Sequence, residues 1–387
     1  MRHKGRQPQS VLTSNGRVRL RRVRWHAAPE GSVTPIDGLL NRAERTFTRG
    51  VREMLCRLNQ CSSSFDKTAE SIGRLTPIEI SGESVRRLVE EEGRLVASVM
   101  RRGRLDAGWS AQQCRTEQGT SRVYLGCDGV NVPIVTDAEK RQRRAKIKAK
   151  RQRCGKKRRP LPPPKRGSDQ AFKEFRVVTA YDESQQRRCV AVTGGDCEAA
   201  GRLMRSVASR LRIDQADESI ANIDGAPWIR SQLELHGVVD RIGLDYYHLK
   251  DDAQKTRREV YGEANQAGRQ WIDSLMTAFL EQGVDAALDS LVQWRKNLRG
   301  RKRQAADRLL GYVAERREMI CYTEFRAPGW QIGSGPTEAQ WKTTTQRLKG
   351  RGRRWDKPHA EALMALSALE ASHLWNSWWE TLDTEAA

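Results

Sequence analysis

Three acidic residues, Asp128, Asp224 and Glu338, lie in sequence surroundings that suit a divalent metal site. Asp128 and Asp224 each end a strand-like segment and are followed by glycine, which lets the backbone turn sharply and leaves the carboxylate facing a cleft. Carboxylates from several elements form the hard oxygen ligands that Mg²⁺ or Mn²⁺ prefers. A pair of such ions would activate a water or a 3′-hydroxyl for in-line phosphoryl transfer. The alternative is that each aspartate only caps a turn.

Glu338 belongs to the segment 332–355, IGSGPTEAQWKTTTQRLKGRGRRW. A proline suits the first helical position, and Gly335 and Gly350 suit the N-cap and a left-handed C-cap, so the segment predicts a helix over 336–349 with Glu338 in its first turn. The cations that share its face or cluster at its far end suit phosphate: Lys342, Arg347, Lys349, Arg351, Arg353 and Arg354. The alternative is that Glu338 merely caps the helix and pairs with Lys342.

The chain is strongly basic, with 70 Lys and Arg against 48 Asp and Glu among 387 residues and a formal net charge of +22. A field of that sign attracts nucleic acid or an anionic membrane. Because the sequence has no run of about 18 apolar residues and no apolar core of a secretion signal, we expect a soluble, intracellular protein without a membrane partner. The eight cysteines are scattered without a CxxC pair, so we expect reduced thiols and no structural zinc.

The elements before Asp128 read as a basic N-terminal arm, 1–34, and a helical domain, 35–102. The arm could form a short ribbon around 17–25, but a solvated tail is favoured. A long apolar stripe that includes Ala43 predicts a first helix from Thr34 to Leu58, and two further helices follow over 64–75 and from Ser81. Three helices with a short turn suit a helix-turn-helix whose third helix, with Arg86 and Arg87 pointing outward, enters a DNA major groove. A plain helical bundle is the alternative.

The elements around the acidic residues predict an α/β domain. Strands are expected at 122–129, 175–182, 187–194, 219–225 and 241–249, and helices at 197–212 and 226–236. This order predicts a mixed sheet covered by helices, with ligand sites at strand ends. We assign this domain to 115–250 and 325–382, with an all-helical insertion at 251–324. A final helix over 358–382 ends in WNSWWE, where Trp375, Trp378 and Trp379 are expected to pack rather than to stack on bases.

A second insertion at 140–166 is dominated by Lys and Arg and ends in PLPPPKRG. Nothing in it can build a core, so we expect a mobile loop or a basic helix. A contact to nucleic acid is favoured over a solubilising or localising tract, because the chain as a whole is basic.

Four motifs resemble the DDE transposases of bacterial insertion sequences, specifically the ISKra-type group related to Mutator elements. They are DG at 128–129, IDGAPWI at 223–229, LDYYHL at 244–249 and, most specifically, the segment 332–355. The resemblance extends over about 64–380. It implies an RNase H-like catalytic domain in which Asp128, Asp224 and Glu338 bind Mg²⁺ or Mn²⁺, as two ions. Arg353 is a departure, because the group more often has an apolar residue there, as in GMRW.

The resemblance also aligns Asp245 and His248 with a DxxH motif beside the active site of Mutator-like enzymes. The alternative for His248 is a strand-end histidine satisfied by hydrogen bonds. The function implied is a DNA transposase that binds the terminal repeats of its element and catalyses metal-dependent cleavage and strand transfer into target DNA. We expect a homo-oligomer on DNA, in the bacterial cytoplasm and associated with the nucleoid. The alternatives are a catalytically silent or domesticated DNA-binding protein and an RNase H-fold nuclease without strand transfer.

Overall fold

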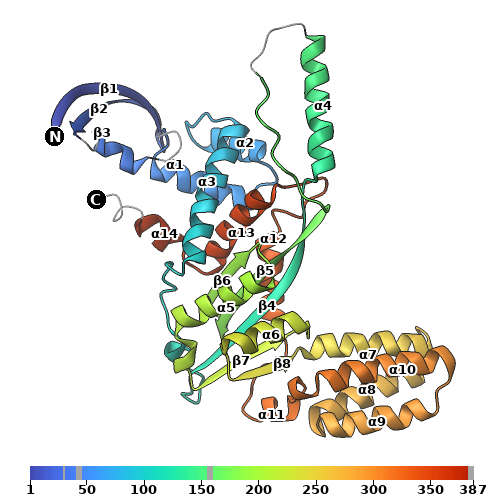
Figure 1. Cartoon of the computed structure of the whole chain (residues 1–387). Coiled ribbons are helices and arrows are strands. Elements are labelled where there is room, and N and C mark those ends of the chain that lie inside the picture. Colours follow the sequence, from blue (N-terminus) through green and yellow to red (C-terminus); the bar gives the residue numbers. More distant parts are fainter. Residues whose placement is uncertain (29–30, 41–45, 155–159, 382–387) are drawn as a thin grey trace.

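A five-stranded mixed sheet forms the centre of the molecule, whose computed structural model describes residues 1–28, 31–40, 46–154 and 160–381 (Figure 1). The strands lie in the order β6-β5-β4-β7-β8. Their bounds are Arg122–Pro133 for β4, Phe172–Asp182 for β5, Arg188–Thr193 for β6, Glu218–Ile223 for β7 and Arg241–Leu244 for β8. β5 is antiparallel to both β4 and β6, whereas β7 is parallel to both β4 and β8. The expected mixed α/β class is confirmed.

Helices cover both faces of this sheet. Their bounds are Gly82–Arg101 for α3, Cys197–Leu211 for α5, Pro227–His236 for α6, Gly335–Thr345 for α12 and Lys357–Ala371 for α13. On one face, Val123, Leu125 and Cys127 of β4 belong to a core shared with α5 and α6. On the other face, Val130 and Val132 belong to a core shared with α3 and α13. Each fully buried side chain of this size stabilises the fold by about 1.5–3 kcal/mol, so the two cores fix the sheet between its helices.

The N-terminal arm is a β-ribbon, which corrects our preference for a solvated tail. β1 (Arg2–Thr13) and β2 (Gly16–Ala27) pair as long antiparallel strands, and the short β3 (Gly31–Val33) pairs with the end of β2. Gly16 has φ +100°, a conformation that glycine adopts easily, and it closes the tight turn between β1 and β2. Backbone hydrogen bonds from Leu12 to Thr46 and from Thr48 to Leu12 fasten the ribbon to the helical domain.

Three helices follow the ribbon, as predicted, but the first begins late. A short 3₁₀ helix, η1 (Pro35–Leu39), replaces the predicted start, and α1 runs from Arg49 to Cys61. Residues 41–45, including Ala43 of the predicted stripe, lie outside the described residues. The second helix, α2, runs from Phe65 to Leu75 and is capped by Ser64, which accepts a hydrogen bond from the Lys67 N–H.

Helix α3 packs against both α1 and α13. Its side chain Glu92 forms a buried two-pronged ion pair with Arg52 of α1, at 2.7 and 3.0 Å. Its Gly93 lies so close to α13 that a Cβ at 93 would stand 2.2 Å from the Ala362 carbonyl oxygen. Helix α3 therefore joins the three-helix unit to the core over the sheet.

The basic tract begins as helix α4 (Asp137–Arg153), which projects away from the sheet (Figure 1). Thr136 and Glu139 form a capping box at its start, and no residue of the helix is buried. Of the two expectations, the basic helix is correct for this part of the tract, whereas residues 155–159 lie outside the described residues.

The insertion is wholly helical, as predicted, and lies to one side of the sheet (Figure 1). Its helices are α7 (Tyr246–Tyr261), α8 (Gln266–Glu281), α9 (Val284–Lys296), α10 (Gly300–Glu315) and α11 (Tyr322–Arg326). Trp271 and Trp294 stack with their ring centroids 4.2 Å apart, and the indole of Trp294 donates to the Tyr261 hydroxyl at 2.8 Å. The strand predicted to reach 249 ends at Leu244, because Asp245 caps α7.

Near the C-terminus, the single helix predicted over 358–382 is broken. Helix α13 ends at Ala371, and α14 (Trp375–Thr381) begins after a turn in which His373 has φ +58°. The three tryptophans of α14, at 375, 378 and 379, are buried, which confirms their packing role. Residue 382 lies outside the described part of the chain. In that described part, no helix is both long and apolar enough to cross a membrane.

Candidate active site

Asp128, on β4, and Asp224, directly after β7, lie near each other where these two parallel strands stop pairing. β4 and β7 pair Leu125 with Ala221, so partners in this ladder are 96 residues apart in the sequence. The same separation holds for Ser121 and Asp217, which are hydrogen-bonded just before the two strands. Asp128 and Asp224 have the same separation, and Asp128 points to the α12 side of the sheet, as Gly126 does, because side chains alternate along a strand. Since neighbouring strands are about 4.8 Å apart, this register brings the two carboxylates together.

The backbone around these aspartates differs in part from the prediction. Asp128 does not end its strand, because β4 continues to Pro133 paired with β5, and Gly129 stays within the strand. Asp224 does follow the last residue of β7, and Gly225 turns the chain with φ +85° as predicted. The parallel ladder stops before Asp128, which therefore lies just beyond the carboxyl end of β7.

Glu338 reaches this face of the sheet because α12 packs closely on β4. A Cβ at Gly126 would stand 1.9 Å from the Thr337 hydroxyl oxygen, so only glycine allows the helix to lie where it does. Gly126 and Asp128 are two residues apart on one strand and point to the same face. The neighbour of Thr337, Glu338, is thereby held over the face that carries Asp128.

Helix α12 is shorter than predicted. It ends at Thr345, and Ser334 rather than Gly335 occupies its N-cap. Gly352, with φ +73°, adopts the left-handed conformation that we assigned to Gly350. The chain after Thr345 instead turns back to the sheet, where a hydrogen bond from the Trp355 N–H to the Pro133 carbonyl ties it to the end of β4.

Asp245 connects the elements around the site. It is 1% exposed, and one carboxylate oxygen accepts from the His248 N–H at 2.9 Å while the other accepts from the Ser334 N–H. The first contact caps α7 and the second holds the loop that leads into α12. Asp245 is therefore a positioning residue that fixes both His248 and the helix of Glu338.

The carboxylates of the predicted triad act on one another electrostatically. Burial, followed by the nearby charge of Asp224 and a smaller contribution from Glu338, raises the pKa of the Asp128 carboxyl to about 6. The Gly129 N–H, which donates to Asp128 at 2.6 Å, and His248 oppose this rise. Asp224, Glu338 and His248 therefore each lie near enough to Asp128 to change the pKa of its carboxyl.

Glu338 has two basic neighbours. Its carboxylate oxygens lie 3.6 Å from His248 Nε2 and 3.5 Å from Lys342 Nζ, and its side chain is 35% exposed. The predicted pair with Lys342 is present and Glu338 lies in the first turn of α12, so pairing is part of its role in this conformation. Among the described side chains, no group of three or more His, Cys, Asp or Glu is close enough together to hold one metal ion. An ion would have to draw the carboxylates inward.

The cations predicted to bind phosphate divide into two groups. Lys342 and Lys349 both lie over the ring of Trp341, and the charge of Lys349 is within range of Asp128, so these two lysines flank the acidic site. Arg347 turns away and is buried between Phe65 of α2 and Trp355. The remaining three of this set, Arg351, Arg353 and Arg354, lie on the turn that follows.

The arginines proposed for a recognition helix are held by acidic neighbours. Arg86 of α3 bonds to Glu83 and Glu90, at 2.6 and 2.7 Å, and Arg87 bonds to Glu83 at 3.1 Å. These hydrogen bonds lower the pKa of Glu83 to about 2. Reading DNA bases with Arg86 or Arg87 would require these pairs to open.

Two residues of the helical insertion reach the site unpredicted. Arg316, after α10, donates from Nε to the Gly225 carbonyl at 3.2 Å, and its guanidinium lies 4.1 Å from the Tyr312 ring centroid. Burial raises the pKa of Tyr312 to about 12, and the charges of Asp224 and Asp245 are among the further causes. No local sequence pattern predicts this contact, because Tyr312 and Arg316 are far from Asp224 in the sequence and meet it only in the folded chain.

Comparison with known proteins adds little to this geometry. No family model matches the sequence, and no curated protein does. Among solved structures, the chain is similar to one titled "Drosophila P element transposase strand transfer complex", with a TM-score of 0.30 and 10% identity, over 86% of this chain and 80% of that chain. A likeness at this level assigns neither a fold family nor a function.

Proposed function

We propose that the chain is a DNA transposase with an RNase H-like catalytic domain, in which Asp128, Asp224 and Glu338 bind two Mg²⁺ or Mn²⁺ ions for strand cleavage and strand transfer. The observation that supports this proposal best is the closeness of Asp128, on β4, to Asp224, just after the neighbouring parallel strand β7, beneath a helix that brings a third carboxylate to the same face. Sequence motifs far apart in the chain thus come together on one face of the sheet.

The donor set suits a hard divalent cation. Carboxylate oxygens are the ligands such ions prefer, and the neighbouring charges that raise the pKa of Asp128 are those that a cation would offset. When bound, the ions would activate the attacking oxygen and stabilise the leaving oxygen of the DNA backbone. The protein's own part is to orient the ligands: the Gly129 and Ala226 N–H groups donate to Asp128 and Asp224, at 2.6 and 2.8 Å.

DNA as the substrate is supported by the charge around the site. Lys342 and Lys349 flank the carboxylates, and Arg316 lies beside Gly225. Cations on both sides of an acidic cluster suit a polyanion whose phosphate must approach carboxylates despite their repulsion. The net charge of +22 favours the same partner.

The proposal is tested by Asp128→Asn, Asp224→Asn and Glu338→Gln, assayed on a duplex that carries the inverted repeats flanking the gene, in Mg²⁺ and in Mn²⁺. Each variant should lose cleavage and joining while DNA binding persists, because an amide keeps the shape of the carboxylate and loses the charge that holds the ion. Glu324→Gln on α11, an exposed position, is the matched control.

Retained joining by Glu338→Gln, together with loss in Glu324→Gln, would show that the third carboxylate is misassigned. Hydrolysis without joined product would favour the nuclease. A wild-type protein that binds the repeats but cuts nothing in either metal would favour the catalytically silent DNA-binding protein.

A further inference from the structure

Three adjoining pockets follow one another along α3 and the start of α13 and share lining residues. Their volumes are about 460, 500 and 460 Å³. The first and second share Lys140, Asp356 and His359 in their walls, and the second and third share Lys357 and Pro358. We call the three together the basic groove.

Helix α3 contributes one arginine to each pocket: Arg86 to the first, Arg94 to the second and Arg101 to the third. At a rise of about 1.5 Å per residue, the row from Arg86 to Arg101 is about 22 Å long. The groove is therefore far longer than a single phosphate or a mononucleotide requires.

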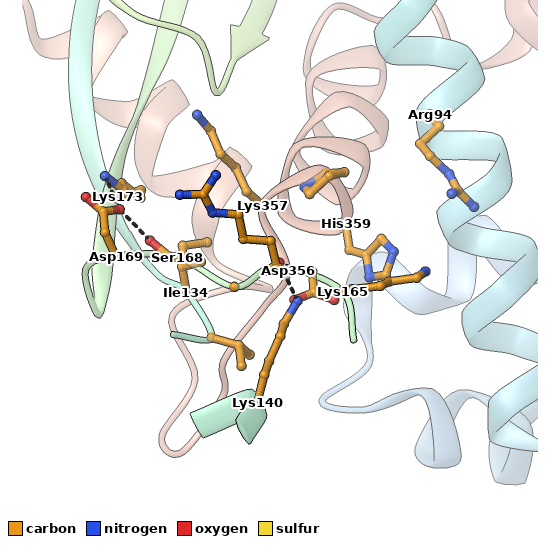
Figure 2. A pocket seen from close by; sticks show the side chains of 14 residues that line it. Arg94, Ile134, Lys140, Lys165, Ser168, Asp169, Lys173, Asp356, Lys357 and His359 are labelled. Atoms are coloured by element: carbon orange, nitrogen blue, oxygen red, sulfur yellow. Dashed lines mark hydrogen bonds and ion pairs between the residues drawn. The ribbon is translucent and has the colours of Figure 1, made fainter. Parts of the chain in front are cut away.

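Positive charge dominates the groove. In each pocket, the lysine and arginine side chains outnumber the carboxylates among the lining residues that the structure describes. Figure 2 shows the middle pocket, where Arg94 of α3 lies opposite His359 of α13 and Lys140 pairs with Asp356 at 2.6 Å. The first turn of α13 lies in the same wall, so the partial positive charge of a 15-residue helix adds to that of the side chains.

Arg347 supplies a buried guanidinium at the end of the groove near the candidate active site. It is 5% exposed, it lines the first pocket, and its Nε is buried without a hydrogen-bond partner among the described residues. Its guanidinium lies 5.1 Å from the Phe65 ring centroid and 5.4 Å from that of Trp355. Burial and the nearby Arg353 lower its pKa to about 10, so it stays charged at neutral pH. Its Nη1 donates to the Ser63 carbonyl at 3.1 Å, but this neutral acceptor leaves the buried Nε unpaired, and a buried charge of this kind is costly unless an anion completes its surroundings.

We propose that the basic groove binds the phosphate backbone of duplex DNA without regard to base sequence, with Arg347 contacting a phosphate. This inference rests on the proposed function, and it places a second DNA contact beside the acidic site. The segment that follows α12 links the two, since Arg347 lines the groove and Lys349 is within range of Asp128. A duplex carries one charge per about 1.7 Å of axis, so about 22 Å of groove faces many phosphates and suits a polyanion.

The test measures binding of a 30-base-pair duplex of arbitrary sequence, by fluorescence anisotropy over a range of salt concentrations, to the full chain. The groove variant carries Arg94→Gln, Arg101→Gln and Lys357→Gln, all at exposed positions. The control variant removes the same charge from exposed positions 301, 302 and 303 on α10, as Arg301→Gln, Lys302→Gln and Arg303→Gln. The slope of log K against log salt should fall by about 0.9 for each phosphate that the groove variant no longer neutralises, and stay near the wild-type value in the control.

A second variant, Arg347→Met, separates binding from folding. Methionine keeps an apolar stem between the two rings and removes a buried charge, which offsets the loss of the hydrogen bond to the Ser63 carbonyl, so the urea midpoint should change little. Affinity for the duplex should nevertheless fall by about tenfold or more. Equal slopes in the groove and control variants, or wild-type affinity in Arg347→Met, would overturn the inference.

The two proposals fail separately. Wild-type DNA binding by the groove variants, with cleavage still lost in Asp224→Asn, would overturn the groove and leave the transposase proposal intact. Loss of DNA binding by the groove variants, with full cleavage in Asp224→Asn, would overturn the triad and support the groove. Polyglutamate serves as a probe for an acidic protein ligand. If the groove variants bound DNA like the wild type but no longer bound polyglutamate, the groove would be assigned to an acidic protein and the inference would be overturned.

Discussion

Gly126→Ala tests how closely the site depends on the contact between β4 and α12. The added Cβ would stand 1.9 Å from the Thr337 hydroxyl oxygen and 2.9 Å from the Thr337 Cβ. Because real contacts of this kind are rarely under 3.0 Å, the helix must retreat by about 1 Å, and Glu338 moves with it. Overpacking of this kind costs about 1–3 kcal/mol of stability. A misplacement of about 1 Å at reacting groups lowers the rate by about 100-fold.

The assay is cleavage and joining of the terminal-repeat duplex in Mg²⁺, with urea unfolding in parallel. Gly126→Ala should lose about 100-fold in rate and keep its DNA affinity. Adding Thr337→Ala, which removes the opposing hydroxyl, should restore part of both losses. Gly311→Ala, a helical position with nothing within 4 Å of the new Cβ, is the control and should be stable and active. A Gly126→Ala protein with wild-type activity would refute the idea that this contact positions Glu338.

Three further predictions concern Asp245, the β-ribbon and His359. In Asp245→Asn, the amide N–H would face one of the two backbone N–H donors, His248 or Ser334, so the free energy of unfolding in urea should fall by about 1–3 kcal/mol. The cleavage rate should fall as well, without a change in DNA affinity. An unchanged cleavage rate would mean that Asp245 only caps α7. Replacing exposed Arg17, Arg19 and Arg21 of β2 by Gln should lower the salt slope of DNA binding by about 0.9 for each phosphate no longer neutralised, and an unchanged slope would mean that the ribbon does not touch DNA. Burial lowers the pKa of His359 despite a neighbouring carboxylate, so the stability that the neutral imidazole contributes should be present above about pH 6.5 and decline as the pH falls below that value. In His359→Gln, the free energy of unfolding in urea should therefore depend less on pH between about pH 7.5 and 5.5.

The sequence was most informative where local periodicity and chemistry agree. Alternating apolar residues identified all five strands, and the glycine after Asp224 identified its turn. The separation of Asp128 and Asp224 was visible too, but its meaning was not, because a separation in sequence becomes a strand register only when two strands are known to pair. The start of the helix of Glu338 was placed to within one residue and its end was not, whereas its distance to β4 depends on Gly126, whose role appears only in the folded contact.

Some signals were present and were read wrongly. The Asn15–Gly16 pair is a strong hairpin signal, and it lies at the turn of the ribbon that we expected to be a tail. Asp245 was read as part of a strand, although an aspartate three residues before a backbone donor is a typical helix cap. The end of the first predicted helix, Leu58, is three residues short of the observed end at Cys61, and its start was wrong, since the apolar stripe begins in the short 3₁₀ helix Pro35–Leu39 while α1 begins only at Arg49.

Other features could not be read from the sequence at all. Arg316 and Tyr312 come from an insertion whose packing beside Asp224 depends on the whole fold. The basic groove likewise combines α3, the start of α4 and α13, and no single stretch contains it. A site assembled from distant segments can be recognised only in the tertiary structure, because local propensity does not predict which surfaces contact one another.

The measurement that tests the central claim most directly is Mn²⁺ binding, measured by titration calorimetry on the protein without DNA. If Asp128, Asp224 and Glu338 form one site, wild type and Glu324→Gln should bind Mn²⁺ with the same affinity, and Asp224→Asn should bind it at least about tenfold more weakly. Wild-type Mn²⁺ affinity in Asp224→Asn would contradict the claim, because the carboxylate that shares the register of Asp128 would then not hold the ion.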